Sequence, residues 1–389
     1  MKILMVAPQP FFEPRGTPFS VLGRLRAISI LGHEVDLITY HIGQDVEIPG
    51  VAIYRTLPIP FIKHIPIGPS LKKLFLDCFL LLKTVRMLLT KQYDLVHSHE
   101  EAGFFGYFLA KWFGARHLYD MHSSLPQQLR NFEYTKFSPL IRVFQWFEQK
   151  VINSSQAVIT ICPALRDQVQ KINARVPHIL IENVSTEGNP DEVTEEDSQH
   201  FRETYDLENN VIVLYAGTCE PYQGLDLLIS SAERVIRKHP NVVFLLMGGQ
   251  PEQFKVYQDQ VAVMGLKSYF RFTGMRPPHE IPKAIRSCDV LVSPRISGTN
   301  TPLKIYGYLQ SGKPIVATNL YTHTQVLNSE VAVLVDPNSQ ALAEGICAVL
   351  EKEELALSVG RRARKLFDQQ YSFQTFLNKT EQVLQLAMR

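Results

Sequence analysis

The sequence predicts an α/β protein of two domains, each built on a parallel sheet of the Rossmann type. Short apolar runs typical of buried strands alternate with helical patterns in both halves of the chain, and this alternation predicts sheets covered by helices. The chain has 389 residues, which is too long for one ordinary hydrophobic core. Residues 186–200 are polar and acidic, and we expect them to form a linker or the entry to the second domain.

Composition and charge narrow the class of protein. The chain is 45% hydrophobic and 20% charged, as expected of a globular protein. Its five cysteines stand singly, which predicts neither a zinc site nor disulfides and favours a reducing, cytosolic compartment. The first residues lead straight into a strand pattern, so we expect no signal peptide. Residues 1–185 carry 20 Lys and Arg against 14 Asp and Glu, a net +6, and residues 186–389 carry 20 against 24, a net −4. The basic half is therefore expected to meet an anionic surface.

The first half opens with a strand, a loop, a helix and a second strand. These are expected at residues 2–8, 13–20, 21–31 and 34–39, and Gly32 would end the helix. Such a βαβ opening predicts a Rossmann-like domain. The loop does not read GxGxxG, so a dinucleotide cofactor has little support.

Residues 57–92 combine many apolar side chains with a net charge of +5. A helical pattern starts after Ser70, a plausible N-cap. Charges interrupt it too often for a membrane-spanning helix, but a basic helix with a wide apolar face can lie in a membrane interface. The alternative is a helix buried against the sheet, with its lysines in solvent. We favour the membrane interpretation because a proline-broken loop before the helix adds apolar surface, at Phe61, Ile62, Ile65 and Ile67.

Two further strands of the first half end in titratable residues. The first carries His97 and His99, followed by Glu100, and the second carries Asp120 and His122. A His-x-His pair suits a metal ion, but no third ligand lies near it in the sequence, so we predict no metal site.

In the second half, residues 289–318 predict a strand, a loop, a helix and another strand. The strands are expected at 290–292 and 315–317, and the helix between them would start near Leu303 and end at Gly312. Ligands bind at the carboxyl edge of open α/β sheets, and a helix N-terminus suits phosphate. Lys304 lies in the first turn of this helix and Arg295 follows the strand, so two cations beside a helix N-terminus predict a diphosphate site.

The segment TPLKIYGYLQSGKPIVAT resembles the nucleotide-sugar-binding segment of the family-four (group 1) retaining glycosyltransferases of the GT-B fold. That segment often reads P-x-K-x-x-E-Y-x-x-x-G-x-P, and the matching residues here are Pro302, Lys304, Tyr308, Gly312 and Pro314. The resemblance implies two Rossmann-like domains facing across a cleft, with an acceptor-side domain at 1–185 and a nucleotide-sugar domain at 186–370. It also implies that a final helix within 371–389 crosses back to pack on the first domain.

The resemblance also implies a donor site. AGTCEPYQG is similar to the family's G-R-L-x-x-x-K-G loop, but Thr218 and Gln223 replace its two cations. The loop at Gly16 and Thr17 matches the family's loop near the donor phosphates, although a plain tight turn explains it equally well. The implied donor-binding residues are Gly16, Thr17, Gly217, Thr218, Gly248, Gly249, Thr273, Asn300, Thr301, Pro302, Leu303, Tyr306 and Gly307.

The function implied is retaining transfer of a sugar from a UDP- or GDP-linked donor to a lipid-linked or polysaccharide acceptor. Arg295 and Lys304 would stabilise the leaving diphosphate and His122 would position the sugar, unless His122 is only a satisfied strand-end histidine. We expect no metal, no cofactor besides the nucleotide-sugar substrate, and no nucleic acid. The protein would be cytoplasmic and peripheral on the inner face of the membrane.

One departure from the family pattern leaves a second interpretation open. Gly307 stands where the family has a glutamate that contacts the donor ribose, so activity is expected to be impaired. Thr218 and Gln223 add to this, and an inactive, membrane-associated binding or scaffold subunit is the alternative. A Gly307→Glu substitution is expected to tighten nucleotide binding and raise thermal stability. A nicotinamide-dependent oxidoreductase comes third, because the glycine fingerprint is missing.

Overall fold

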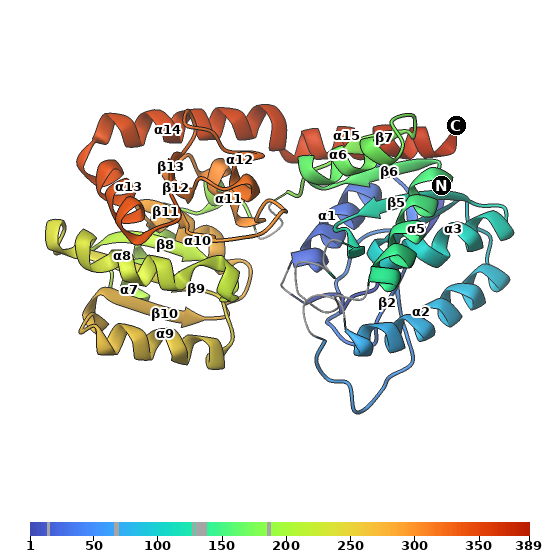
Figure 1. Ribbon diagram of the computed structural model, residues 1–389, viewed down its shortest axis with the longest axis horizontal. Helices are drawn as coiled ribbons and strands as arrows, with labels where there is room; N and C mark the ends of the chain where they lie inside the picture. Colours follow the sequence, from blue (N-terminus) through green and yellow to red (C-terminus); the bar gives the residue numbers. More distant parts are fainter. Residues whose placement is uncertain (14–15, 66–69, 127–128, 130–137, 185–187) are drawn as a thin grey trace. The chain divides into compact units, whose positions relative to one another are not determined.

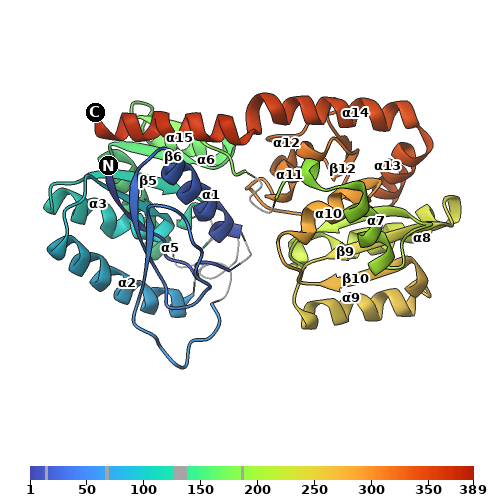
Figure 2. The same cartoon turned by 180° about the vertical axis from the view of Figure 1, so that it is seen from behind.

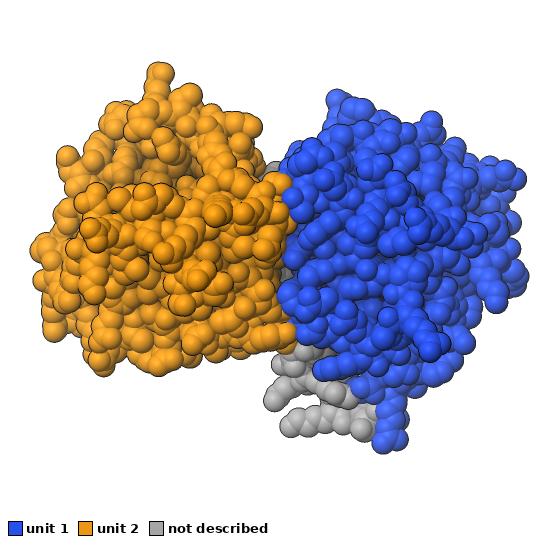
Figure 3. Space-filling model, turned by 90° about the horizontal axis from the view of Figure 1, so that it is seen from above, with its two compact units in different colours: residues 1–183, 373–389 blue, residues 184–372 orange. Residues whose placement is uncertain are grey.

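The computed structural model describes the chain except for residues 14–15, 66–69, 127–128, 130–137 and 185–187. The chain divides into two compact units, coloured separately in Figure 3. Unit 1 comprises Met1–Asn183 with Phe373–Arg389, and unit 2 comprises Val184–Ser372. These divisions fall within two residues of the expected boundaries, and residue 185 itself lies outside the described residues.

Unit 1 is built on a seven-stranded parallel sheet with the order β3-β2-β1-β4-β5-β6-β7 (Figure 1). The sheet grows outward in both directions from β1, as in doubly wound folds, so a switch point lies between β1 and β4. Its strands are β1 (Lys2–Val6), β2 (Glu34–Thr39), β3 (Val51–Arg55), β4 (Leu95–His99), β5 (Arg116–Met121), β6 (Ala157–Thr160) and β7 (His178–Leu180).

Helices cover the sheet of unit 1, and the final helix of the chain belongs to this unit (Figure 2). Leu76 and Leu80 of helix α2 (Leu71–Thr90) share a buried cluster with Leu109 of helix α3 (Gly103–Trp112) and with strand residues. These two helices therefore pack over the same side of the sheet. The helices are α1 (Gly16–Ile30), α2 (Leu71–Thr90), α3 (Gly103–Trp112), α5 (Ser138–Ser154), α6 (Pro163–Ile172) and α15 (Phe373–Met388), with a 3-10 turn η1 (Glu100–Ala102) after β4.

Helix α1 begins earlier than predicted. The sequence places a loop over 13–20, but Gly16 and Thr17 already form the first helical turn. Pro18 misled the prediction, although proline is tolerated in the first turn because the amides there lack intrahelical partners. Residues 14–15 of the predicted loop lie outside the described residues.

The segment at 57–92 has features of both interpretations, because some of its apolar residues are buried against the sheet and others are exposed. Ser70 caps α2 as predicted, because its Oγ accepts a hydrogen bond from the Lys73 amide at 3.2 Å. Ile62 and Ile65, expected to be surface, are instead buried with the core under α2, while Phe61 is exposed. Ile67 lies outside the described residues. Within the described ranges, no helix has the length and continuous apolar sequence that crossing a bilayer requires.

Unit 2 repeats the plan with a six-stranded parallel sheet in the order β10-β9-β8-β11-β12-β13. The strands are β8 (Val211–Ala216), β9 (Val242–Met247), β10 (Phe270–Gly274), β11 (Val290–Ser293), β12 (Ile315–Thr318) and β13 (Val333–Val335). The helices are α7 (Glu195–Thr204), α8 (Leu225–Lys238), α9 (Pro251–Val263), α10 (Glu280–Ser287), α11 (Lys304–Ser311), α12 (Tyr321–Thr324), α13 (Ser339–Glu351) and α14 (Glu353–Leu366). As in unit 1, the strand order reverses beside the first strand of the sheet, here between β8 and β11.

The acidic stretch at 186–200, predicted as linker or domain entry, contains the start of a helix. Thr194 accepts a hydrogen bond from the Asp197 amide, and the Asp197 carboxylate accepts one from Thr194 in return. This capping box starts α7. The stretch has few apolar residues and therefore shows no helical periodicity. The three-residue spacing of Thr194 and Asp197 is nevertheless a sequence signal for the start of a helix.

Candidate active site

The cation predicted at the start of α11 meets the loop that follows β8. The Lys304 Nζ lies 3.6 Å from the centre of the Tyr215 ring. A Cβ atom on Gly217 would stand 2.8 Å from the same Nζ, so this glycine leaves room for the lysine. Gly312 ends α11 in the left-handed conformation, as predicted. The structure thus brings Lys304 and Gly217 together from segments far apart in the sequence.

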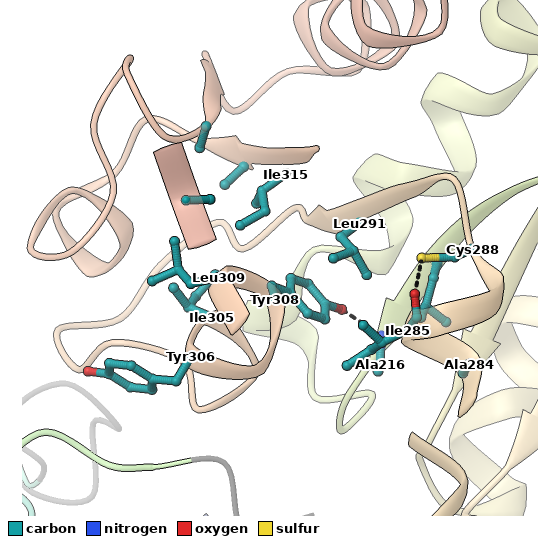
Figure 4. Close-up of a cluster of buried hydrophobic side chains, with 14 of the residues drawn as sticks. Ala216, Ala284, Ile285, Cys288, Leu291, Ile305, Tyr306, Tyr308, Leu309 and Ile315 are labelled. Atoms are coloured by element: carbon teal, nitrogen blue, oxygen red, sulfur yellow. Dashed lines mark hydrogen bonds between the residues drawn. The ribbon is translucent and has the colours of Figure 1, made fainter. Parts of the chain in front are cut away.

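Helix α11 is held to β8 by its buried face (Figure 4). The Tyr308 hydroxyl accepts a hydrogen bond from the Ala216 amide at 3.0 Å, and Ile305 and Leu309 pack in the same core. Tyr306, a predicted donor-binding residue, also lies in this core, with its ring 5.2 Å from that of Tyr371. Gly307 is buried on the same helix.

Glycine loops at the ends of three neighbouring strands of unit 2 lock together. The Gly217 amide donates to the Met247 carbonyl and the Gly248 amide donates to the Gly274 carbonyl, each at 2.9 Å. Gly248 has a φ of 103° and a Cβ atom there would collide with the Gly217 carbonyl, so only glycine fits. The predicted Gly249 follows Gly248 in the loop after β9, and the predicted Thr273 is in β10, directly before Gly274.

The second predicted cation, Arg295, is already engaged within unit 2. Its Nη1 donates to the Asn300 carbonyl at 2.7 Å and to the Thr322 hydroxyl at 2.8 Å, and its guanidinium lies 5.0 Å from the Tyr222 ring centre. Burial lowers the pKa of Arg295 from its ordinary value. In the described part of the chain, its Nε and the hydroxyl of Thr301 are buried without a hydrogen-bond partner. Pro302 and Leu303 follow at the start of α11.

The two positions where the family pattern has cations form a neutral pair. The Gln223 Nε2 donates to the Thr218 hydroxyl at 3.3 Å. Gly224 keeps the left-handed turn that starts α8, and a Cβ atom there would collide with the Pro294 carbonyl. The shape of the loop is therefore kept although its charge is lost.

In unit 1 the predicted residues meet where β4 and β5 end. Register pairs His99 with Asp120 on these neighbouring strands. The His99 Nδ1 lies 2.9 Å from the His122 Nε2, which lies 3.2 Å from the Asp120 Oδ1. The His97 Nε2 lies 3.3 Å from the Asp120 Oδ2. The carboxylate of Asp120 is the centre of this cluster.

An arginine that the sequence gave no reason to select completes the cluster. The Arg24 Nε donates to the Asp120 Oδ2 at 3.0 Å, and both side chains are fully buried. Burial alone would raise the pKa of Asp120, but Arg24 and His122 beside it hold that pKa well below its usual range. Burial lowers the pKa values of His97 and His99, so both imidazoles are neutral near pH 7.

Asp120, which is distant in the sequence, provides the third potential metal ligand beside His97 and His99. His97, His99 and Asp120 place one potential ligand atom each within 4.8 Å of one another. The guanidinium of Arg24 already neutralises the carboxylate and opposes a second positive charge there. The arrangement therefore suits a hydrogen-bonded network better than a metal ion.

Carboxylates surround the same end of the unit 1 sheet. Glu100 has a left-handed backbone, with φ 47°, and its side chain accepts a hydrogen bond from Thr17. Burial raises the pKa of Glu100, and it raises that of Glu148 to about 7. These side chains help to line a pocket formed by Glu100, Glu101, Phe104, Tyr119, Ser123, Leu125 and Glu148. The sequence analysis did not select Glu148, because a lone acid on an amphipathic helix carries no distinctive signal.

The chain has two parallel sheets with polar residues at their carboxyl edges. Together with the structural matches given below, this arrangement identifies the fold as the GT-B fold of glycosyltransferases. Residues 16–182 match the family described as Glycosyltransferase Family 4, and residues 197–366 match Glycosyl transferases group 1. The chain belongs to the group 1 glycosyltransferases, as the sequence resemblance predicted, and its class of activity is glycosyl transfer.

Individual relatives and structures agree with this assignment. Phosphatidyl-myo-inositol mannosyltransferase of Mycobacterium tuberculosis is 23% identical over 384 residues, 95% of this chain and 93% of that protein. The putative glycosyltransferase YtcC of Bacillus subtilis is 28% identical over 184 residues, only 44% of either chain. Sucrose-phosphate synthase from Thermosynechococcus elongatus superposes with a TM-score of 0.80, at 18% identity and 99% and 98% coverage. Anabaena HepE in complex with UDP gives a TM-score of 0.76, at 19% identity and 99% and 100% coverage.

Proposed function

We propose that this protein transfers a sugar with retention from a UDP- or GDP-linked donor to a lipid-linked or polysaccharide acceptor. The observation that carries the proposal is the meeting of Lys304 with the glycine loops of unit 2 at the start of α11. A cation, a helix N-terminus and close-approaching backbone together suit a diphosphate. A solved relative, Anabaena HepE, binds UDP and UDP-glucose, which supports a nucleotide-sugar as the substrate.

The donor diphosphate would lie against Lys304 and the backbone of residues 300–303. Arg295 shapes that segment through the Asn300 carbonyl, and its buried Nε and the Thr301 hydroxyl offer further hydrogen bonds. Charge that develops on the leaving diphosphate would be stabilised by these fixed donors. No metal and no other cofactor enter the proposal.

In the retaining reaction, the leaving phosphate takes the proton of the acceptor hydroxyl on the same face of the sugar. This chemistry needs no nucleophile from the protein, and it depends on orientation and on stabilising the leaving group. We assign the nucleotide to unit 2, and the acceptor to unit 1. His122, held in its buried network, would position the sugar.

The acceptor class is proposed from the surface of α2. Five apolar side chains of this helix are exposed, Leu71, Leu74, Phe75, Leu82 and Leu89, and we call them the α2 apolar face. The exposed Lys72 and Arg86 lie on the same helix, and a basic helix with an apolar face binds anionic membrane interfaces. By its name, the mycobacterial relative acts on a phospholipid. We therefore place the protein on the cytoplasmic side of a membrane.

A donor screen tests the proposal. The protein is incubated with UDP- and GDP-sugars and a membrane extract, and products are read by mass spectrometry. A new glycolipid or glycan mass that requires one nucleotide-sugar is the expected result. Calorimetry with the same donors distinguishes the alternative, because an inactive scaffold subunit would bind a nucleotide without giving any product. The neutral Thr218–Gln223 pair is the observation that keeps this alternative open.

A vesicle-binding assay tests the membrane surface. Lys73 is unsuitable as a target, because its Nζ is buried 3.1 Å from Glu101, so the substitutions are Lys72→Glu with Arg86→Glu. Their combination should weaken binding to anionic vesicles by about 1 kcal/mol per basic residue removed. Arg237→Glu, at an exposed site of unit 2, is the matched control. Equal binding by the double variant and the wild type would exclude α2 from the contact.

A further inference from the structure

Three side chains with metal-binding atoms meet in unit 2, at the ends of two neighbouring helices. His239 is the C-cap of α8, and Cys347 and Glu351 lie in the last two turns of α13. Each of the three offers one potential ligand atom, and these atoms all lie within 4.8 Å of one another. The donors are therefore an imidazole nitrogen, a sulfur and a carboxylate oxygen.

Packing between α8 and α13 brings these residues together (Figure 1). The two helices share a buried cluster that contains Leu228, Ala232 and Val235 of α8 and Leu342, Ala343 and Ile346 of α13. Cys347 and Glu351 are four residues apart, so they lie on the same face of α13. The cysteines stand singly in the sequence, and only this packing gives Cys347 its neighbours.

Both helices present their C-terminal ends at this place. Helix α8 ends at Lys238 and α13 ends at Glu351. The C-terminal end of a helix carries a partial negative charge, which favours a bound cation. Two such ends therefore add to the negative charge of the Glu351 carboxylate.

The donor atoms and the measured distance suit zinc. The His239 Nε2 lies 3.5 Å from the Glu351 Oε1, and among the described residues this nitrogen is buried without a hydrogen-bond partner. Zinc bonds of about 2.0–2.3 Å in tetrahedral geometry place the ligand atoms about 3.3–3.8 Å apart. Magnesium and calcium prefer sites made of oxygen alone, whereas sulfur and imidazole favour zinc. Three protein ligands leave the fourth position to water.

A lysine beside the cluster competes with a metal but does not exclude it. The Lys238 Nζ lies 3.1 Å from the same Glu351 Oε1, and the Lys238 side chain is 59% exposed. It can therefore turn into solvent when another cation takes the carboxylate. Arg24 in unit 1 cannot do so, because both it and its partner Asp120 are fully buried. This difference favours His239 and its neighbours over the Asp120 cluster as a metal site.

We propose that His239, Cys347 and Glu351 form a zinc site that ties the ends of α8 and α13 together. The cysteine binds as thiolate, so its proton passes to solvent when the metal binds. Both helices follow a strand of the parallel sheet and run back to its amino edge. The site therefore lies at the edge opposite the glycine loops, and the metal takes no part in the proposed sugar transfer.

The first test is metal binding by the full-length protein without a histidine tag. The protein is freed of metal with a chelator and titrated with zinc chloride in a calorimeter. One zinc ion should bind per chain and should raise the temperature of thermal unfolding. A wild-type protein that binds no zinc overturns the proposal.

Cobalt in place of zinc tests the sulfur ligand. The wild-type protein should show the charge-transfer absorption of a cobalt–thiolate bond, and Cys347→Ala should abolish it. Cys288→Ala removes another buried thiol of unit 2 and is the matched control, which should keep the absorption. If Cys347→Ala keeps the absorption, the metal binds elsewhere and the assignment is wrong.

Surface substitutions test the other side of the site without disturbing the core. Glu351→Gln should weaken zinc binding at least about 10-fold, and Glu354→Gln, at an exposed carboxylate of the same unit, should not change it. Lys238→Ala should act in the opposite direction and tighten zinc binding roughly two- to fivefold, the scale of an exposed ion pair. Unchanged affinity in Glu351→Gln, or weaker binding in Lys238→Ala, contradicts the proposed ligand set.

Discussion

The carboxyl edges of the two sheets use the same strand order for different chemistry. In unit 2 the strands end in glycine loops and the polar groups that reach them are cations, Lys304 and Arg295. In unit 1 the corresponding edge carries buried histidines and carboxylates, centred on Asp120 and Glu100. Backbone amides and cations suit phosphate, whereas carboxylates and imidazoles suit hydroxyl groups. The comparison teaches that a shared fold leaves function to the residues that follow each strand.

The largest effect on binding and turnover is expected from substitutions of Lys304 and His122, which lie at the two sheet edges compared above. Lys304→Ala should weaken nucleoside-diphosphate binding by about 1.5–3 kcal/mol or more, the scale of a charge-assisted hydrogen bond, and should abolish turnover. His122→Ala, at the other edge, should reduce turnover but leave diphosphate affinity near that of the wild type. Calorimetry with UDP and GDP measures both. If the two variants lose the same affinity, the division of roles between the units is wrong.

Gly307→Glu is expected to have an intermediate effect with two opposite parts. The added carboxylate should tighten nucleotide binding by about 1.5–3 kcal/mol if it reaches the ribose hydroxyls. The expected rise in thermal stability is revised, because Gly307 is buried and an unpaired carboxylate there costs about 1–3 kcal/mol. Thermal unfolding with and without nucleotide gives both values. Gly307→Ala is the control, and a Glu variant that binds no better than the Ala variant would show that this protein does not use the ribose contact.

Buried neutral histidines give the smallest expected effect, and each unit provides an example: His323 in α12 of unit 2 and His117 in β5 of unit 1. The His323 Nδ1 donates to the Thr318 carbonyl and its Nε2 accepts from the Ser293 hydroxyl, each at 2.8 Å. In unit 1, the His117 Nε2 and Nδ1 lie 2.6 Å and 2.9 Å from the hydroxyls of Ser98 and Ser155. Burial lowers the pKa of His323 to about 4 and that of His117 to about 3.

The sign of the pH effect follows from these shifts. The unfolded chain takes up a proton at each histidine below about pH 6.5, while the folded protein does so only near pH 4 or pH 3. Stability is therefore present above pH 6.5 and is lost as the pH falls, by about 2 kcal/mol per histidine between pH 7 and pH 5. Urea unfolding of His323→Gln at both pH values should show a smaller loss than the wild type by this amount. An unchanged pH dependence would mean that His323 is not buried as a neutral ring.

Much of the fold could be predicted because its signals are local. Apolar runs gave the strands at 290–292 and 315–317, the Ser70 cap gave the start of α2, and Gly312 gave the end of α11. Each of these signals depends on neighbours within one or two turns of chain. The roles of the predicted site residues stay predictions, although the structure brings Lys304 and Gly217 together.

Other features depended on contacts that sequence spacing does not contain. Thr17 was taken as loop because a proline follows it, yet it begins α1. The lysines of residues 57–92 were expected at a membrane interface or in solvent, but Lys73 forms an ion pair with Glu101. The apolar residues Ile62 and Ile65 could have faced a membrane or the core, and only the packing under α2 decided for the core.

By itself the sequence determined the alternation of strands and helices, the family, and the cation at the start of α11, because periodicity and short motifs are written along the chain. Only the tertiary structure decided that His99 lies beside Asp120 and that Arg24, far away in sequence, neutralises it. Register between strands and the partner of a buried charge are non-local, since they follow from which elements pack together. The charge on a histidine or a carboxylate depends on that packing through burial and neighbouring charges.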